Sequence, residues 1–320
     1  MPSSEPAVLD LLLRVGCRLI YQNTLPMTLL LSVKPYTNPN QRVEAETMAF
    51  GQDPRIDSYT DSYGNFVYRV FLRPGQHEIK HDALVAVSSV PENHDLVQGE
   101  LVSPRELPPE LIRYTLPSRY CDSDKLADFA WKHFGEVENG LPRVRAISTW
   151  LHQNIEYRYG SGRADLSASE VLQRGHGVCR DFAHLLVALC RTFNLPARYV
   201  TGHLPDIAAI DATGHMDFHA YTEVYLSGRW HTFDARFNVP RTGRVKIAHG
   251  LDAVDSAFSM FFGAAALTHF EVWAYQIERG TVALGDPIDL SKRLDNRMEV
   301  LHRLPVPGTS PAEEVAGLNF

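Results

Sequence analysis

The first part of the chain alternates apolar and polar residues in short runs. Between residues 12 and 90 apolar positions recur two apart, as at Val15, Cys17 and Leu19. Side chains two residues apart lie on the same face of a strand, so this spacing predicts strands with one buried face. Pro74 and Gly75 form one of the turn signals that separate the runs. Together these features predict an all-β domain, most simply a sandwich of two sheets.

The periodicity changes near residue 118. Prolines become frequent just before this point, and beyond it the apolar residues recur at the three- and four-residue spacing of helices. We therefore expect an N-terminal β domain at residues 1–117 and a second domain at residues 118–304. The last residues, 305–320, are rich in Pro, Gly and acidic side chains and are expected to form a flexible tail.

Helices and then strands are expected in the second domain. The helices lie near residues 122–134, 142–155, 167–173 and 179–193, and the strands at residues 197–203, 219–226, 229–234 and 267–277. The fourth helix is apolar on most sides, since Phe182, Leu186 and Leu189 step by four and three residues and other apolar side chains fill the flanks. Such a helix is expected to be buried at the centre of its domain.

Composition and charge exclude several classes of function. The chain has 320 residues, of which 44% are hydrophobic, and its 31 Lys and Arg against 38 Asp and Glu give a net charge of -7. No basic run stands out, so nucleic acid is not an expected partner. No apolar stretch approaches the roughly 20 residues of a membrane-spanning helix, and Asp10 interrupts the apolar N-terminal segment, which argues against a signal peptide. We expect a cytoplasmic protein without membrane contact, whose oligomeric state the sequence does not indicate.

One of the four cysteines has an unusual position. Four thiols are too few for a disulfide scaffold in a chain of this size, so reduced cysteines are expected. Cys179 is expected at the first turn of the fourth helix, where exposed backbone N–H groups and the helix dipole favour a thiolate. Gly175 and Gly177 leave the approach to this turn open. Asp181 opposes thiolate formation, and Arg180 offsets part of this effect. Alone, Cys179 could still be an incidental cysteine.

A hairpin supplies candidate partners for this thiol. If Ser227 and Gly228 form a two-residue turn, Tyr221 lies opposite Asp234, and His219 points to the same face as Tyr221. Diagonal neighbours of this kind lie about 7 to 8 Å apart at the backbone, a gap that an imidazole and a carboxylate can span. The register therefore predicts a His219–Asp234 hydrogen bond, the pairing that a general base and its orienting carboxylate require.

Each candidate residue also has a structural interpretation. A histidine in a strand is commonly a satisfied core residue, and Asp234 could cap the turn at Ala235-Arg236. Acyl transfer also needs N–H donors for an oxyanion, of which the backbone of Cys179 is the natural first. The amide of Gln173 is a weak candidate for the second, and a solvated helix-end residue is its simpler interpretation.

At these residues the sequence resembles the bacterial transglutaminase-like family, which is related to the papain-like cysteine proteases. The similar segments are Gly177-Val178-Cys179-Arg180-Asp181-Phe182-Ala183, Leu195-Pro196-Ala197-Arg198-Tyr199-Val200, His219-Ala220-Tyr221-Thr222-Glu223-Val224 and Trp230-His231-Thr232-Phe233-Asp234, with a boundary segment at residues 116–121. They fall within residues 116–290 and present Cys, His and Asp in the order of the family. The β region before them resembles the N-terminal domain often attached to bacterial members.

The resemblance implies an α+β fold. An all-β, sandwich-like N-terminal domain precedes a papain-like core, in which the Cys-bearing helix packs against an antiparallel sheet. It further implies acyl transfer through a thioester, with Cys179 as nucleophile, His219 as base and Asp234 as its orienting partner. No cofactor or metal is expected, because the sequence has no acidic loop like the calcium sites of animal tissue transglutaminases.

Several functions remain open at this stage. The first is hydrolysis of amide, peptide or isopeptide bonds, and the second is transfer of the acyl group to an amine on the same site. A third is a non-catalytic peptide-binding module of the same fold. A fourth is a metal protein, since His215 and His219 have a spacing found among zinc ligands, with Cys179 or His203 as further ligands. The expected substrate is a peptide, a protein or a small amide.

Overall fold

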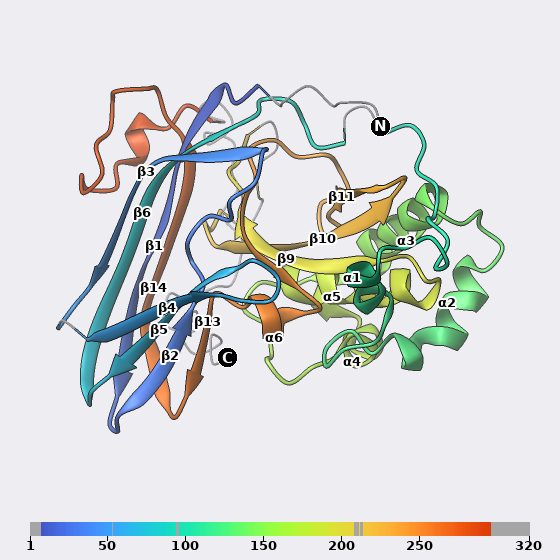
Figure 1. Cartoon of the computed structure of the whole chain (residues 1–320), viewed down its shortest axis with the longest axis horizontal. Coiled ribbons are helices and arrows are strands. Elements are labelled where there is room, and N and C mark those ends of the chain that lie inside the picture. Colours follow the sequence, from blue (N-terminus) through green and yellow to red (C-terminus); the bar gives the residue numbers. More distant parts are fainter. Residues whose placement is uncertain (1–7, 53, 94–95, 208–210, 212–213, 296–320) are drawn as a thin grey trace.

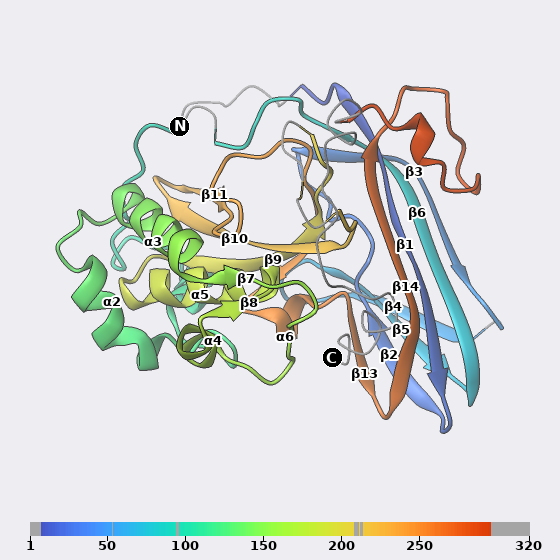
Figure 2. The ribbon, with the colours of Figure 1, turned by 180° about the vertical axis from the view of Figure 1, so that it is seen from behind.

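The computed structural model describes residues 8–52, 54–93, 96–207, 211 and 214–295. Two parts lie side by side, a β sandwich and a mixed core of helices and strands (Figure 1). The same arrangement is seen from behind, where the helices of the core lie away from the sandwich (Figure 2). The predicted α+β fold, with an all-β part before a papain-like core, is confirmed. The predicted tail at residues 305–320 lies outside the described residues.

Two antiparallel sheets form the sandwich. One has the order β14-β1-β6-β3 and the other the order β13-β2-β5-β4. Apolar side chains from both sheets, such as Leu19 and Leu29, share one core cluster, as the alternation of the sequence predicts. The strands are β1 (Leu11–Asn23), β2 (Met27–Leu31), β3 (Gln41–Phe50), β4 (Arg55–Thr60), β5 (Phe66–Leu72), β6 (Gly75–Val87), β13 (Ser259–Phe262) and β14 (Ala265–Gln276).

The sandwich is built from two separate stretches of the chain. The strand predicted at residues 267–277 exists as β14, but it pairs with β1, and β13 pairs with β2. The sequence-based division into residues 1–117 and 118–304 places β13 and β14 in the second domain and does not anticipate that they pair with strands of the first. The reason is physical: alternation reports that a strand has one buried face, whereas its partner strand depends on contacts far away in the sequence.

The core places one helix against a four-stranded sheet. Helix α5 (Cys179–Thr192) packs on β10 and β9, and the sheet order is β11-β10-β9-β12. The strands are β9 (Ala197–His203), β10 (Phe218–Leu226), β11 (Arg229–Phe233) and β12 (Val245–Gly250), with a parallel pair β7 (Glu156–Tyr157) and β8 (His176–Gly177) beside them. The other helices are α1 (Pro109–Ile112), α2 (Ala127–Phe134), α3 (Leu141–Asn154), α4 (Ala168–Arg174) and α6 (Ala253–Ser256), with short 3-10 turns at Arg113–Thr115, Ser123–Leu126 and Leu290–Lys292.

Burial on all sides holds α5 in place, as its sequence predicts. Every residue from Arg180 to Arg191 is buried, including Leu185, Leu186 and Leu189 at 0% exposure. Burial of each such leucine side chain stabilises the folded state by roughly 1.5 to 3 kcal/mol. At the C-terminal end, the buried Arg191 guanidinium donates to the carbonyl groups of Ala197 and Leu251, at 2.9 and 2.7 Å. The helix that carries Cys179 is therefore rigidly seated against the sheet.

Side chains of both parts meet where the sandwich faces the core. Phe218 of β10 and Ile247 of β12 belong to the same apolar cluster as Leu29 of β2 and Val272 of β14. The interface therefore lies directly beside the strand that carries His219. Among the helices of the described part of the chain, none is long and apolar enough to cross a membrane.

Candidate active site

Cys179 is the first residue of α5, as predicted, and its side chain is half-buried. The Asp181 carboxylate accepts a hydrogen bond from the backbone N–H of Val178 at 3.0 Å and so closes the first turn. The guanidinium of Arg180 pairs with the same carboxylate at 2.9 Å. The sequence-based view that Arg180 offsets the charge of Asp181 agrees with this contact.

The two glycines before Cys179 serve the backbone. Gly175 ends α4 with a φ of 74°, in the left-handed region where glycine is favoured. A Cβ atom on Gly177 would lie 2.6 Å from the Cβ of Asp181, so only glycine fits there. Both glycines therefore allow the loop to approach the first turn of α5 closely. The sequence-based expectation, that they leave substrate access open, did not include this requirement.

The hairpin register is confirmed. Strand β10 pairs with β11 so that Leu226 lies opposite Arg229, and Ser227 and Gly228 have φ values of 47° and 86°. Positive φ at both turn residues is the geometry that keeps a two-residue hairpin in register. As a result, Nε2 of His219 and Oδ2 of Asp234 lie 2.7 Å apart, and both side chains are buried.

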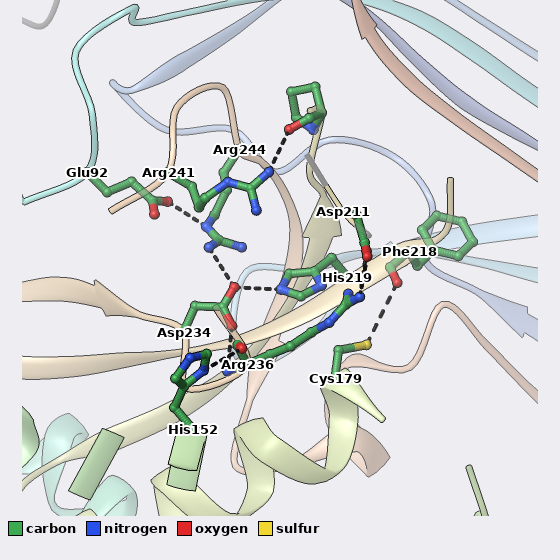
Figure 3. A network of polar contacts seen from close by, with 11 residues as sticks. Glu92, His152, Cys179, Asp211, Phe218, His219, Asp234, Arg236, Arg241 and Arg244 are labelled. Carbon is green, nitrogen blue, oxygen red and sulfur yellow. Dashed lines mark hydrogen bonds and ion pairs between the residues drawn. The ribbon is translucent and has the colours of Figure 1, made fainter. Parts of the chain in front are cut away.

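Asp234 accepts three hydrogen bonds. Besides His219, Nη2 of Arg244 donates to the same Oδ2 at 2.7 Å, and the backbone N–H of Arg236 donates to Oδ1 at 3.1 Å. Asp234 therefore contacts both the His219 ring and the turn at Ala235-Arg236. Arg244 also pairs with Glu92 at 2.7 Å, and Figure 3 shows this chain of contacts. Burial raises the pKa of the Asp234 carboxyl, but His219 and Arg244 outweigh burial and hold this pKa well below its ordinary range.

The imidazole of His219 is poised as a neutral base. Burial lowers its pKa, and the positive charges of Arg244 and Arg236 lower it further against the opposing effect of Asp234. Because Nε2 is bonded to a carboxylate, Nε2 carries the proton and Nδ1 is the ring nitrogen that can accept one. Figure 3 places the ring between Asp234 and Cys179.

The surroundings of Cys179 shift the pKa of its thiol. Burial raises its pKa to about 11, with Arg236 lowering it and Asp217 raising it. The sulfur lies 4.0 Å from the carbonyl oxygen of Phe218, a long contact in which the thiol is the donor. This shift is opposite in direction to the one expected from the helix N-terminus, because the cost of burying a charge is its largest cause.

Two cavities meet at Cys179 and His219. One has a volume of about 290 Å³ and is lined largely by aromatic and aliphatic side chains. The other is smaller, about 30 Å³, and its lining includes three carboxylates and two guanidinium groups. Asp217 borders both, and burial raises its pKa to about 7. A carbonyl group bound at the sulfur therefore has an apolar space on one side and a charged space on the other.

Of the other residues singled out in the sequence, His215 lines the smaller cavity, whereas Gln173 does not border the site. Gln173 is exposed on α4 and lines neither cavity, so the structure supports its simpler interpretation. The ring of His215 stacks on Tyr159 at 4.6 Å, and His203 is buried beside Phe218. Within the part of the chain that the structure describes, no three His, Cys, Asp or Glu side chains are grouped closely enough to hold a metal ion.

Sequence reasoning missed the residues that surround the His219–Asp234 pair. Arg244 precedes β12, Glu92 lies in the segment after β6, and Arg236 follows Asp234 in a loop. Charged loop residues are usually solvated, and no local spacing links these three to His219. The only signal was indirect: a buried carboxylate that orients an imidazole needs further donors for its remaining lone pairs.

Similarity to known proteins agrees with this arrangement. Residues 128–235, which include Cys179, His219 and Asp234, match the family model described as the transglutaminase-like superfamily. A crystal structure of a candidate cysteine protease from Cytophaga hutchinsonii is 32% identical, covers 88% of this chain and 96% of its own, and superposes with a TM-score of 0.76. The chain belongs to the transglutaminase-like superfamily. Helix α5 and strands β9, β10 and β11 lie within the residues that match.

Curated relatives of this superfamily member are similar over shorter stretches of the chain. An uncharacterized protein of Mycobacterium leprae is 30% identical over 126 residues, 38% of this chain and 45% of its own length. Human kyphoscoliosis peptidase is 30% identical over 107 residues, 31% of this chain and 16% of its own length. The chain therefore spans less than half the length of these relatives. The transglutaminase-like fold is that of enzymes using a cysteine for acyl transfer or hydrolysis.

Proposed function

We propose that this protein hydrolyses amide, peptide or isopeptide bonds through a thioester on Cys179. His219 serves as the general base and Asp234 orients it. The observation that carries the proposal is the 2.7 Å hydrogen bond between His219 and Asp234, in a buried site that opens on the cavity beside Cys179. An imidazole held in this way, next to a thiol at a helix N-terminus, is the arrangement that nucleophilic catalysis requires.

Acylation follows from the protonation states. Sγ of Cys179 attacks the carbonyl carbon while Nδ1 of His219 takes the thiol proton, which a thiol of raised pKa does not release unaided. The negative oxygen of the tetrahedral intermediate accepts from the backbone N–H of Cys179. When the C–N bond breaks, the imidazolium gives its proton to the leaving amine, and the acyl group remains on sulfur as a thioester.

Deacylation repeats the same proton path. Water attacks the thioester carbonyl, its proton passes to Nδ1 of His219, and the C–S bond breaks to release a carboxylic acid. The proton then returns to the sulfur. Asp234 is suited to this cycle because its depressed pKa keeps it a carboxylate while the imidazole charges and discharges.

The names of two relatives support hydrolysis. One relative is a peptidase and another a candidate cysteine protease. One observation favours an amine as acceptor instead of water: Asp217 lines the charged cavity beside Cys179 and can meet an ammonium group, while Asp211 and Asp206 of the same cavity pair with Arg236 at 2.6 Å and with Arg293 at 3.6 Å. Transfer of the acyl group to a primary amine is therefore the second candidate on the same site.

A peptide-library experiment tests both. The purified full chain is incubated with a mixed peptide library in buffer alone and in buffer with the diamine cadaverine, and products are identified by mass spectrometry. New carboxylic ends in buffer alone support hydrolysis, whereas cadaverine adducts in place of free acids support transfer. Cys179→Ala and His219→Ala proteins are the controls. If neither product forms with the wild type, or if folded Cys179→Ala gives the same products, the proposal is wrong and a peptide-binding role is left.

A further inference from the structure

The larger cavity beside Cys179 is aromatic on most sides. Eight of its described lining residues are Phe or Tyr, and about 290 Å³ of space lies between them. A cavity of this size is at the lower end of ligand pockets and holds one large side chain with its flanking backbone. The two arginines on its rim are engaged elsewhere: Arg163 pairs with Asp165 at 2.6 Å and Arg180 with Asp181 at 2.9 Å. The space therefore suits an uncharged, bulky apolar group.

One wall of this cavity comes from the β sandwich. Met260 and Phe261 of β13 and Phe270 of β14 line it together with Phe258, which precedes β13. The rings of Phe258 and Phe218 stack at 4.8 Å, and those of Phe258 and Phe270 lie 5.7 Å apart. This cluster joins the sandwich to β10, the strand of His219. The sandwich is thus part of the site's wall as well as a neighbouring unit.

The size and lining of the two cavities distinguish the two halves of a substrate. The smaller cavity, about 30 Å³, is lined by charged side chains such as the Asp211–Arg236 pair at 2.6 Å, and it is too small for a bulky acyl side chain. The larger cavity also borders Val178 and Arg180, on either side of Cys179 at the first turn of α5. The acyl half therefore belongs in the aromatic cavity.

We propose that the enzyme selects acyl groups with a large apolar or aromatic side chain next to the reacting carbonyl, and that Phe261 of strand β13 in the sandwich contacts this side chain. The proposal rests on the proposed function, because it assumes that acyl groups are transferred to Cys179. It assigns the sandwich a direct role in substrate choice.

Acyl chloromethyl ketones test this without a known substrate. The Cys179 sulfur displaces chloride from the probe, forming one C–S bond while the thiol proton passes to His219. Rates of Cys179 labelling are measured by mass spectrometry for the acetyl-phenylalanyl, acetyl-glutaminyl and acetyl-alanyl probes, each divided by the rate with iodoacetamide. We expect the phenylalanyl probe to react at least about tenfold faster than the alanyl probe, as for apolar side chains in fitted pockets.

Neighbouring positions on β13 provide a matched pair of variants. Phe261→Ala should lower the phenylalanyl-to-alanyl rate ratio about tenfold, whereas Phe262→Ala should leave it unchanged, because Phe262 is 62% exposed and lines a different cavity. Ala257→Phe, which fills the cavity from its rim, should lower the same ratio without enlarging the space.

The outcomes separate this proposal from the proposed function. Equal rates for all three probes, or equal loss in the Phe261→Ala and Phe262→Ala proteins, would overturn the selection of apolar acyl groups. Absence of amide turnover with an intact preference for the phenylalanyl probe would instead overturn the proposed function and leave the acyl-binding cavity standing.

Discussion

Two buried arginine–carboxylate pairs, one in each part of the molecule, differ in what surrounds them. In the sandwich, Arg14 donates to both oxygens of Asp82 at 3.0 and 2.7 Å, and the indole N–H of Trp273 donates to the same carboxylate at 3.1 Å. Further guanidinium N–H groups of Arg14 donate to the carbonyl oxygens of Asp286 and Pro287. The other partners of the pair are an indole N–H and backbone carbonyl groups, which do not ionise near neutral pH, so the pair is a structural connection between strands and the segment after β14.

The second pair, Arg244 and Asp234, contacts an imidazole, a group that can gain or lose a proton near neutral pH. The Oδ2 atom that accepts from Arg244 also accepts from His219 at 2.7 Å, and Arg244 divides its charge between Asp234 and Glu92. Both pairs are almost completely buried. Burial and geometry alone therefore do not distinguish a structural ion pair from one in a reactive site. The group that makes the third contact to the carboxylate does: it is Trp273 in the first pair and His219 in the second.

The largest expected effect is the loss of chemistry without loss of the fold. Cys179→Ala removes the thiol placed at the cavity and leaves both ion pairs intact, so turnover should vanish while the melting temperature stays within about a degree or two of the wild type. Turnover of the peptide library measures the first effect, and thermal melts measure the second. A Cys179→Ala/His219→Ala double variant should have no lower turnover than Cys179→Ala alone, since the residues act as one unit. Residual turnover in the folded single variant would contradict this placement of the nucleophile.

Removing the carboxylate of the second pair should reduce turnover strongly. Asp234→Ala frees the His219 ring and leaves Arg244 beside it, which disfavours the imidazolium, so turnover should fall by up to about 10⁴-fold with measurable activity remaining. Stability should also drop, because Arg244 loses a buried partner. Single-turnover rates at saturating substrate separate these effects. A fall in stability with unchanged turnover per folded molecule would make this pair structural, like the first.

Breaking the sandwich pair should affect stability alone. Asp82→Ala leaves the Arg14 guanidinium buried without its counter-charge, which typically costs about 3 to 5 kcal/mol in the free energy of unfolding. Urea denaturation measures this loss. The Trp273 N–H also loses its acceptor, so Trp273→Phe in the same background tests how much of the loss is due to that bond. Turnover per folded molecule should remain that of the wild type, and a selective loss of turnover would refute the distinction between the two pairs.

The smallest effect concerns the pH dependence of thiol labelling. Because burial raises the pKa of Cys179 to about 11, its rate of reaction with iodoacetamide should rise about tenfold per pH unit through neutral and alkaline pH. The thiolate-based expectation from the sequence was a fast reaction well below pH 8. Cys17 and Cys121 are fully buried with pKa values raised to about 12, so Cys179 should still react first. A plateau beginning below pH 7 would show a thiolate–imidazolium pair at rest.

Local patterns in the sequence predicted much of the site because its parts are joined by short-range geometry. The two-residue turn at Ser227 and Gly228 sets the hairpin register, and the register alone brings His219 to Asp234. The helix that begins at Cys179 follows equally from local apolar spacing. These inferences need no knowledge of distant contacts.

The rest depends on contacts between distant segments. The partner of β14 and the approach of Glu92 and Arg244 to the site are set by folding of the whole chain, so no local pattern reports them. The pKa of Cys179 is another case, since the helix terminus was visible in the sequence and the burial that outweighs it was not. Gln173 was chosen for nearness in sequence to Cys179 and lies outside both cavities.

The return of β13 and β14 to the sandwich has a consequence for the order in which the enzyme becomes competent during synthesis. Cys179, His219 and Asp234 leave the ribosome well before residues 258–270, which supply the sandwich side of the cavity wall. Strand β14 must then find β1, more than two hundred residues earlier, and contacts of such separation form slowly. The nascent chain thus carries its reactive groups before it has the cavity that selects among substrates, and selectivity is acquired only when the last strands dock.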